Sequence, residues 1–307
     1  MSPMPSPPTL RCLFLLAAIY VANIPAATFA DDKWEGVKSW VYQLTDYQDD
    51  KLDEIAATSF ELAVVDLARD GGGEYFTKAE IDTVKKSGKI VLAYFEIGAI
   101  EDYRPEWDTV PKDLKAGAVE GWPKEQYVKF WDERWWPVVK GRVDRALSAG
   151  FDGAYLDLVT AYEEIPSKES ERETLAHKMV DLIARISQYA KAKDPDFKIV
   201  PQNCPELYTW AFWEPKPNQK YLNAVDGLGL ESVFYLAHDK PAEASWCKEN
   251  RDNALALRKA GKLVLGIDYA KKEKNITSAY ARQRAIGFVP YASVQDLNMI
   301  SNPPSGK

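Results

Sequence analysis

The sequence predicts an α/β protein that forms a single (β/α)8 TIM barrel. From residue 40 onward, short apolar runs rich in β-branched and aromatic residues alternate with helix-like segments. This alternation is typical of parallel strands joined by crossover helices. Eight such units over about 250 residues match the size of a (β/α)8 barrel. No linker-like segment divides them, so one domain is expected.

Each of the eight apolar runs is expected to supply one barrel strand. In chain order they are Trp40–Leu44, Leu62–Ala68, Ile90–Ile97, Gly153–Val159, Lys198–Asn203, Gly227–Ser232, Leu263–Tyr269 and Ile286–Ser293. Runs of this length bounded by turn residues suit strands that are buried on both faces.

Start and stop signals predict helices between the strands. Thr77 and Glu80 have capping-box spacing, and Gly88 follows the segment that they begin. Pro137 suits the first turn of a second helix, which Gly150 can terminate.

Two further helices and one irregular segment complete the pattern. Apolar residues three and four apart predict a long helix over 167–193, and a helix ending at 260 is closed by Gly261. The stretch from Tyr103 to Lys129 has no clear period and contains prolines, so a long loop or a small excursion is expected there.

The first 30 residues resemble an export signal. Arg11 is their only charged residue, an apolar run follows it, and the small residues Thr28 and Ala30 precede the expected cut. The alternative is a membrane anchor, but the uninterrupted apolar run is too short to cross about 30 Å of hydrocarbon. We therefore expect a signal peptide at 1–30 and a secreted or periplasmic mature chain, 31–307, with no membrane partner.

Composition and charge exclude several classes of protein. A hydrophobic content of 46% with 28% charged residues excludes a chain that is mainly disordered. The formal charge is −7, and loss of Arg11 with the signal makes it −8. A dispersed set of cations on an acidic chain argues against a nucleic-acid partner. A monomer that binds a neutral or cationic ligand is expected.

The few histidines and cysteines limit which kinds of metal, nucleophile and disulfide site the chain can form. His177 and His238 are the only histidines and are far apart in the sequence, so no metal site and no cofactor are expected. The sequence contains no Gly-x-Ser-x-Gly nucleophile motif. After signal removal Cys204 and Cys247 remain, and the sequence leaves open whether they pair.

Polar residues cluster at the predicted carboxyl ends of the strands, where barrel enzymes hold their active sites. They are Asp66, Glu96, Asp157, Asn203, Glu231 and Asp268. Residues two apart share a side of a strand, so Glu231 lies on the glycine side of its strand and is expected to face the barrel axis. The same parity is expected to direct Tyr94 with Glu96, Tyr155 with Asp157, and Asp268 inward. A single acid at a strand end more often has a structural role, but five acids on one rim of the barrel favour a catalytic site.

Converging carboxylates without a histidine or thiol nucleophile suit glycoside hydrolysis. One acid protonates the leaving oxygen while another attacks or activates water. Ten tryptophans and sixteen tyrosines add flat surfaces that suit sugar rings, with Trp122 and Tyr235 near predicted loops or strand ends, although core packing explains many of them.

Five segments together resemble the endo-α-1,4-polygalactosaminidase family, glycoside hydrolase family 114, and its bacterial and archaeal relatives. They are Tyr94–Arg104, Tyr127–Asp132, Gly150–Tyr162, Val200–Asn203 and Asp226–Tyr235. The segments follow the family's order and cover nearly the whole mature chain.

The resemblance implies a barrel that cleaves α-1,4 bonds in galactosamine-containing polysaccharide. It implies Asp157 as nucleophile and Glu231 as acid/base, while the residues alone leave these roles reversible. The expected sugar-binding residues are Asp66, Glu96, Tyr94, Tyr155, Asn203, Tyr235 and Asp268, and Glu101, Asp102 and Arg104 form a loop that either shapes a subsite or is structural.

Two departures from the family pattern affect the expected site. Thr160 and Ser232 stand where many relatives carry a further acid, which bears on how the nucleophile is oriented and which sugar is recognised. A non-catalytic carbohydrate-binding barrel is the main alternative, and amide hydrolysis is a weaker one.

Overall fold

The computed structural model describes residues 32–210 and 213–304. Residues 33–307 form one compact unit. The expected signal peptide, 1–30, lies outside the described residues. Within the described ranges, no helix combines the length and apolarity needed to cross a membrane.

All eight predicted barrel strands are confirmed. They are β1 (Trp40–Gln43), β2 (Leu62–Asp66), β3 (Ile90–Glu96), β7 (Gly153–Asp157), β8 (Lys198–Pro201), β9 (Gly227–Glu231), β12 (Leu263–Asp268) and β13 (Val289–Ala292). They pair in parallel in the orders β1-β2-β3-β7-β8 and β9-β12-β13.

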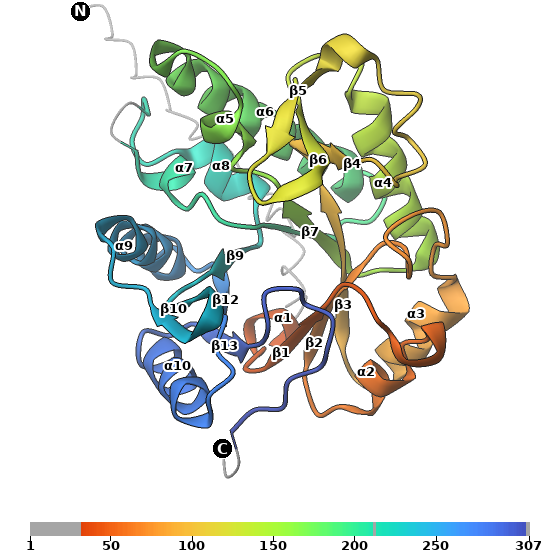
Figure 1. The fold of residues 1–307 in the computed structure, drawn as a ribbon, viewed down its shortest axis with the longest axis vertical. Helices are drawn as coiled ribbons and strands as arrows, with labels where there is room; N and C mark the ends of the chain where they lie inside the picture. Colours follow the sequence, from red (N-terminus) through yellow and green to blue (C-terminus); the bar gives the residue numbers. More distant parts are fainter. Residues whose placement is uncertain (1–31, 211–212, 305–307) are drawn as a thin grey trace, which may run out of the picture. The chain divides into compact units, whose positions relative to one another are not determined.

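Two contacts join the two sheets into a (β/α)8 barrel. Gln202, just after β8, forms a parallel bridge with Gly229 in β9. At the other junction the Trp40 indole N–H donates to the carbonyl oxygen of Val289 at 3.0 Å, linking β1 to β13. Figure 1 shows the strands at the centre with helices outside them.

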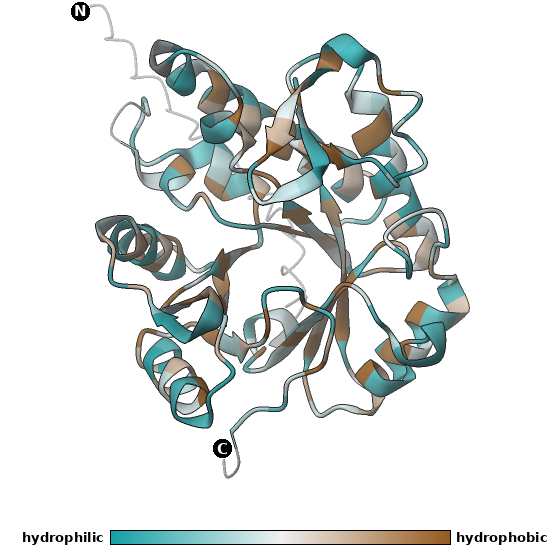
Figure 2. Cartoon of the chain, viewed as in Figure 1, coloured by the Kyte–Doolittle hydropathy of each residue, from teal (hydrophilic) through white to brown (hydrophobic). Residues whose placement is uncertain are grey.

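The helices have the expected amphipathic pattern, with hydrophobic residues toward the strands and polar ones outward (Figure 2). They are α1 (Asp32–Glu35), α2 (Asp53–Ala57), α3 (Lys78–Lys86), α4 (Trp136–Ala149), α5 (Ala161–Glu164), α6 (Arg172–Lys191), α7 (Glu206–Thr209), α8 (Gln219–Ala224), α9 (Ser245–Lys259) and α10 (Glu273–Ala285). Thr77 and Glu80 form the predicted capping box at α3. Gly150 ends α4 at φ 82°. The long helix begins at Arg172, five residues later than predicted.

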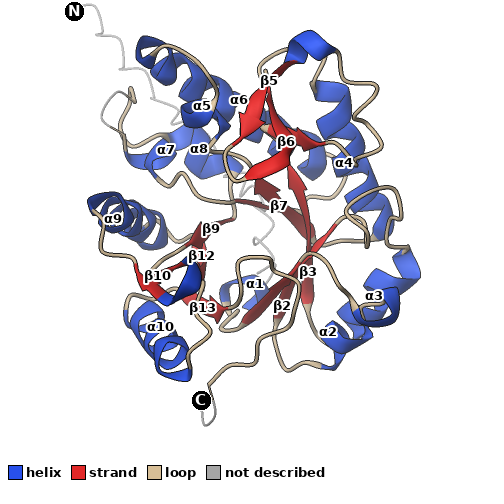
Figure 3. Cartoon of the chain, viewed as in Figure 1, coloured by secondary structure: helices blue, strands red, loops and turns tan. Residues whose placement is uncertain are grey.

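The irregular segment after β3 contains a small antiparallel sheet, which the sequence did not predict. Its strands are β4 (Ala99–Glu101), β5 (Lys115–Val119) and β6 (Trp122–Val128), in the order β4-β6-β5. Figure 3 shows these strands apart from the barrel, beside α4. Glycines and prolines within β5 and β6 hid the strand pattern.

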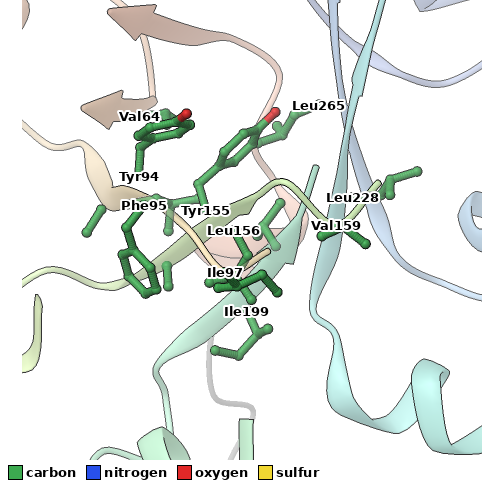
Figure 4. Close-up of a cluster of buried hydrophobic side chains, with 14 of the residues drawn as sticks. Val64, Tyr94, Phe95, Ile97, Tyr155, Leu156, Val159, Ile199, Leu228 and Leu265 are labelled. Atoms are coloured by element: carbon green, nitrogen blue, oxygen red, sulfur yellow. The ribbon is translucent and has the colours of Figure 1, made fainter. Parts of the chain in front are cut away.

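Aromatic rings fill the barrel interior. Tyr155 packs against Trp40 and Tyr42 with ring centroids 6.2 and 5.1 Å away. A Cβ at residue 229 would clash with the Tyr155 hydroxyl, so Gly229 makes room for this ring. Figure 4 shows Tyr155 on the same side as Tyr94 and Leu265, opposite Leu156. The barrel interior is therefore filled with packed aromatic side chains rather than being an open channel.

The two remaining cysteines, Cys204 and Cys247, are both buried and both free. The structure therefore shows no disulfide between them.

Candidate active site

A cleft of about 610 Å³ opens at the carboxyl ends of the barrel strands. Nine of its lining residues are carboxylates: Asp66, Asp70, Glu101, Glu120, Glu125, Asp157, Glu164, Glu231 and Asp296. Among the residues that the structure describes, no lysine, arginine or histidine lines it. The cleft is therefore acidic.

Asp157 ends β7 on the floor of this cleft. The Tyr94 hydroxyl donates to its Oδ2 at 2.6 Å, and the Leu158 backbone N–H donates to its Oδ1 at 2.7 Å. Burial first, and then the charge of Glu231, raise the pKa of Asp157 to about 7. The group therefore exchanges its proton near neutral pH, as acid–base catalysis requires, and acts as a nucleophile only in its ionised form.

Glu231 ends β9 on the same cleft, and its carboxylate accepts hydrogen bonds from two neutral donors. The Asn203 side-chain amide donates to its Oε2 at 2.7 Å, and the Tyr269 hydroxyl donates to its Oε1. Its own backbone N–H donates to Asn203 Oδ1 at 3.1 Å. These contacts fix the direction of the carboxylate and leave it without a cationic partner.

The backbone next to both acids is unusual. Leu158, Asn203 and Ser232 have positive φ values of 54°, 63° and 53°, which non-glycine residues rarely adopt. Such strain is characteristic of functional sites. Gly98 supports the turn after Asp157, because a Cβ there would collide with the carbonyl oxygen of Leu158.

A second set of carboxylates is bound to arginine. Arg104 forms ion pairs with Asp66 at 3.0 Å, Glu96 at 2.7 Å and Glu101 at 2.6 Å, and Arg142 from α4 pairs with Glu96 at 2.9 Å. Although burial opposes ionisation, the two guanidinium groups hold the pKa of Glu96 well below its usual range. This network fixes the β3 end and the loop that follows it.

The antiparallel sheet forms one wall of the cleft. Trp122 at the start of β6 is 51% exposed, and Tyr103 in the preceding loop is 46% exposed; both line the cleft. Glu120 and Glu125 lie along the same wall. Exposed rings beside hydrogen-bonding groups suit a sugar, since its apolar face packs on the ring.

The structure brings five of the predicted site residues together at the cleft: Asp66, Tyr94, Asn203, Asp157 and Glu231. Glu96, Tyr155, Tyr235 and Asp268 do not line it. Glu96 is fully buried beneath the arginines, and Tyr155 is fully buried in the floor. Tyr235, 9% exposed, belongs to the short antiparallel pair β10 (Tyr235–Leu236) and β11 (Lys240–Pro241).

The prediction that Asp268 faces the barrel axis is wrong. Asp268 is fully buried and accepts hydrogen bonds from the backbone N–H groups of Phe234 and Tyr235 and from Gln283 in α10. Both faces of β12 are apolar, so parity could not be read from the sequence. Tyr269, one residue later, supplies the group that reaches Glu231.

Tyr42 and Gln202 were also not identified from the sequence as residues of the cleft. The Tyr42 hydroxyl donates to Gln202 Oε1 at 2.9 Å, and both side chains line the cleft. Both residues lie within predicted strands, so the sequence could have indicated that they reach the cleft.

Thr160 and Ser232, the two departures from the family pattern, line the cleft as well. In the described part of the chain, no group of three or more histidine, cysteine or acidic residues could hold a metal ion.

Comparisons with known proteins agree with this geometry. An uncharacterized protein of Deinococcus radiodurans is 33% identical over 276 residues, covering 87% of this chain and 84% of the relative. An uncharacterized protein of Methanocaldococcus jannaschii is 32% identical over 275 residues, covering 85% and 76%.

Two solved structures have the same fold. One is Aspergillus fumigatus Ega3 in complex with galactosamine, with a TM-score of 0.66, 16% identity and coverage of 86% of this chain and 94% of that one. The other is the glycoside hydrolase domain of PelA from Pseudomonas aeruginosa, with a TM-score of 0.68, 18% identity and coverage of 87% and 99%. The model of glycoside hydrolase family GH114 matches residues 23–306. The chain therefore belongs to family GH114 and is a glycosidase.

Proposed function

We propose that this glycosidase cleaves α-1,4-galactosaminidic bonds in galactosamine-containing polysaccharide. The observation that carries the proposal is a cleft lined by nine carboxylates and, among the described residues, by no basic side chain. A polymer of free galactosamine is cationic, so this surface attracts it and repels anionic polysaccharides. Ega3, which has the same fold, was solved with galactosamine bound.

In the proposed reaction, Asp157 is the nucleophile and Glu231 is the acid/base. Asp157 attacks the anomeric carbon while Glu231 protonates the departing glycosidic oxygen, and Glu231 then takes a proton from the water that releases the sugar. Tyr94 and the Leu158 N–H orient the nucleophile, and Asn203 and Tyr269 orient the acid/base. Asp66 lines the cleft as a sugar-binding residue, fixed by Arg104.

The pH profile separates the two assignments of roles. The pKa of Asp157 is raised to about 7, so kcat/KM is expected to fall as the pH drops through about 7, when the nucleophile becomes protonated. If the acid limb lies well below pH 7 and the alkaline limb falls near 7 instead, the group with the raised pKa is the proton donor and the roles are reversed.

The decisive experiment measures new reducing ends after incubating the mature protein with deacetylated and with acetylated galactosaminogalactan. Release from the deacetylated polymer supports the proposal. Binding without release, at enzyme concentrations where a hydrolase exhausts its substrate, would instead favour a non-catalytic carbohydrate-binding barrel.

Export of a monomeric mature chain is part of the proposal. Arg11, the apolar run and the small residues before Asp31 support removal of residues 1–30. The amino-terminal sequence and native mass of the protein recovered outside the cytoplasm test both points.

A further inference from the structure

Glu125 on β6 is a buried carboxyl group with an unused oxygen. Its side chain lines the cleft, yet the residue is only 6% exposed. Its Oε1 has no hydrogen-bond partner in the described part of the chain. A buried polar atom without a partner is costly, and because Glu125 also lines the cleft, a ligand bound there is a candidate to supply the missing group.

The surroundings of Glu125 are acidic. Glu101 stands directly opposite it in the β4–β6 pairing. Burial first, and then the charges of Glu96 and Asp157, raise the pKa of Glu125 to about 9, against the opposing effect of Arg104 and Arg142. The neutral, protonated form therefore dominates at neutral pH while the cleft is empty.

The arginines of the neighbouring network do not pair with Glu125. Arg104 directs its nitrogens to Asp66, Glu96 and Glu101, and Arg142 bonds to Glu96. Glu125 takes part in none of these ion pairs. Among the described residues, no ion pair therefore occupies this carboxyl group, which leaves it available to a cationic ligand.

We propose that Glu125 binds the protonated amine of a galactosamine residue in the cleft and thereby selects deacetylated over acetylated polymer. This inference rests on the proposed function and deepens it. An ammonium group supplies both the positive charge and the N–H donors that the carboxylate needs. An acetamide supplies one neutral donor and no positive charge.

Binding of the amine changes the protonation of the site. The ammonium stabilises the ionised carboxylate, so the proton held by Glu125 leaves to solvent when the sugar binds. At neutral pH about one proton is expected to be released per bound galactosamine at this position. A purely structural Glu125 would release none.

The first test compares KM on galactosamine oligomers and on their N-acetylated counterparts. Glu125→Gln keeps the shape but cannot ionise, so KM for the deacetylated oligomer should rise about tenfold to a hundredfold with little change in kcat. KM for any acetylated oligomer that is cleaved should stay the same. Glu120→Gln, which removes an exposed carboxylate from the same wall, is the matched comparison and should raise KM less than about threefold. Equal KM values for Glu125→Gln and the unmodified protein would overturn the inference.

The second test does not depend on turnover. Titration calorimetry of the Asp157→Asn variant with galactosamine oligomer, in two buffers of different ionisation enthalpy, counts the protons released and removes Asp157 as their source. The release should disappear in the Asp157→Asn/Glu125→Gln double variant. A persistent release in that variant would assign the proton to another group and overturn the inference.

The two proposals can fail separately. If the unmodified protein releases no reducing ends but the calorimetry shows amine binding linked to Glu125, the hydrolytic function fails and the subsite stands. If the protein cleaves the polymer and neither test involves Glu125, the function stands and the subsite fails.

Discussion

The strand ends of this barrel hold two sets of carboxylates that differ in what surrounds them. Asp66, Glu96 and Glu101 are locked to arginine, whereas Asp157 and Glu231 are held only by hydroxyl, amide and backbone N–H donors. In the first set, the two arginines keep Glu96 ionised, whereas burial raises the pKa of Asp66 and Glu101 in spite of their contact with Arg104. In the second set, neutral donors orient the carboxyl groups and no ion pair holds them among the described residues. The sets are close in the fold but suited to different tasks.

The largest expected effect separates the two sets by activity. Asp157→Asn or Glu231→Gln should lower kcat on galactosamine polymer by about a thousandfold or more, because each removes a reacting group. The reducing-end assay measures the loss. Both variants should remain folded at the assay pH, which circular dichroism checks. Near-normal turnover in both variants would refute the pair.

The free energy of unfolding should depend most on the carboxylates that are paired with arginine. Glu96→Gln leaves Arg104 and Arg142 buried and partly unpaired, so the free energy of unfolding should fall by about 3 kcal/mol at neutral pH. The pKa of Glu96 is lowered by folding, so its stabilising effect exists above the unfolded value of about 4.3 and disappears as the pH falls below it. Denaturant unfolding at neutral and acidic pH measures this difference. A loss independent of pH would contradict the assigned role of its charge.

The contribution of Asp157 to stability should change with pH in the opposite direction to that of Glu96. Its pKa is raised from an unfolded value of about 3.9 to about 7, so its contribution to stability is complete below the former and is lost as the pH rises through the latter. Asp157→Asn should therefore gain about 4 kcal/mol relative to the unmodified protein between acidic and mildly alkaline pH. The same unfolding experiments measure it, and a constant difference would show that the carboxyl is not desolvated.

The smallest expected effect concerns the wall of the cleft. Trp122→Ala removes an exposed ring and should raise KM for long oligomers about tenfold, with less change for short ones and little change in kcat. Trp246→Ala, which removes a ring exposed to a similar degree that does not line the cleft, is the control. Equal KM changes in the two variants would exclude a sugar-stacking role.

The barrel and its acid pair could be predicted from the sequence because both depend on local patterns. Apolar runs marked the eight strands, and glycine parity in β9 placed Glu231. Parity failed at Asp268, where both faces of β12 are apolar and nothing in the strand distinguishes inside from outside. The difference between paired and unpaired acids could not be predicted, because Arg104 and Arg142 reach Glu96 from a loop and from α4, contacts that only the tertiary fold creates.

The sheet formed by β4, β5 and β6 has a consequence for how this enzyme could diversify. It is inserted between two barrel strands and carries Trp122, Glu120 and Glu125, whereas the proposed catalytic acids, Asp157 and Glu231, belong to the barrel itself. Exchanging this insert for that of a relative would alter which polymer is accepted and leave the bond-breaking apparatus untouched. Chimeric proteins built at these two junctions are thus a direct route to new specificities.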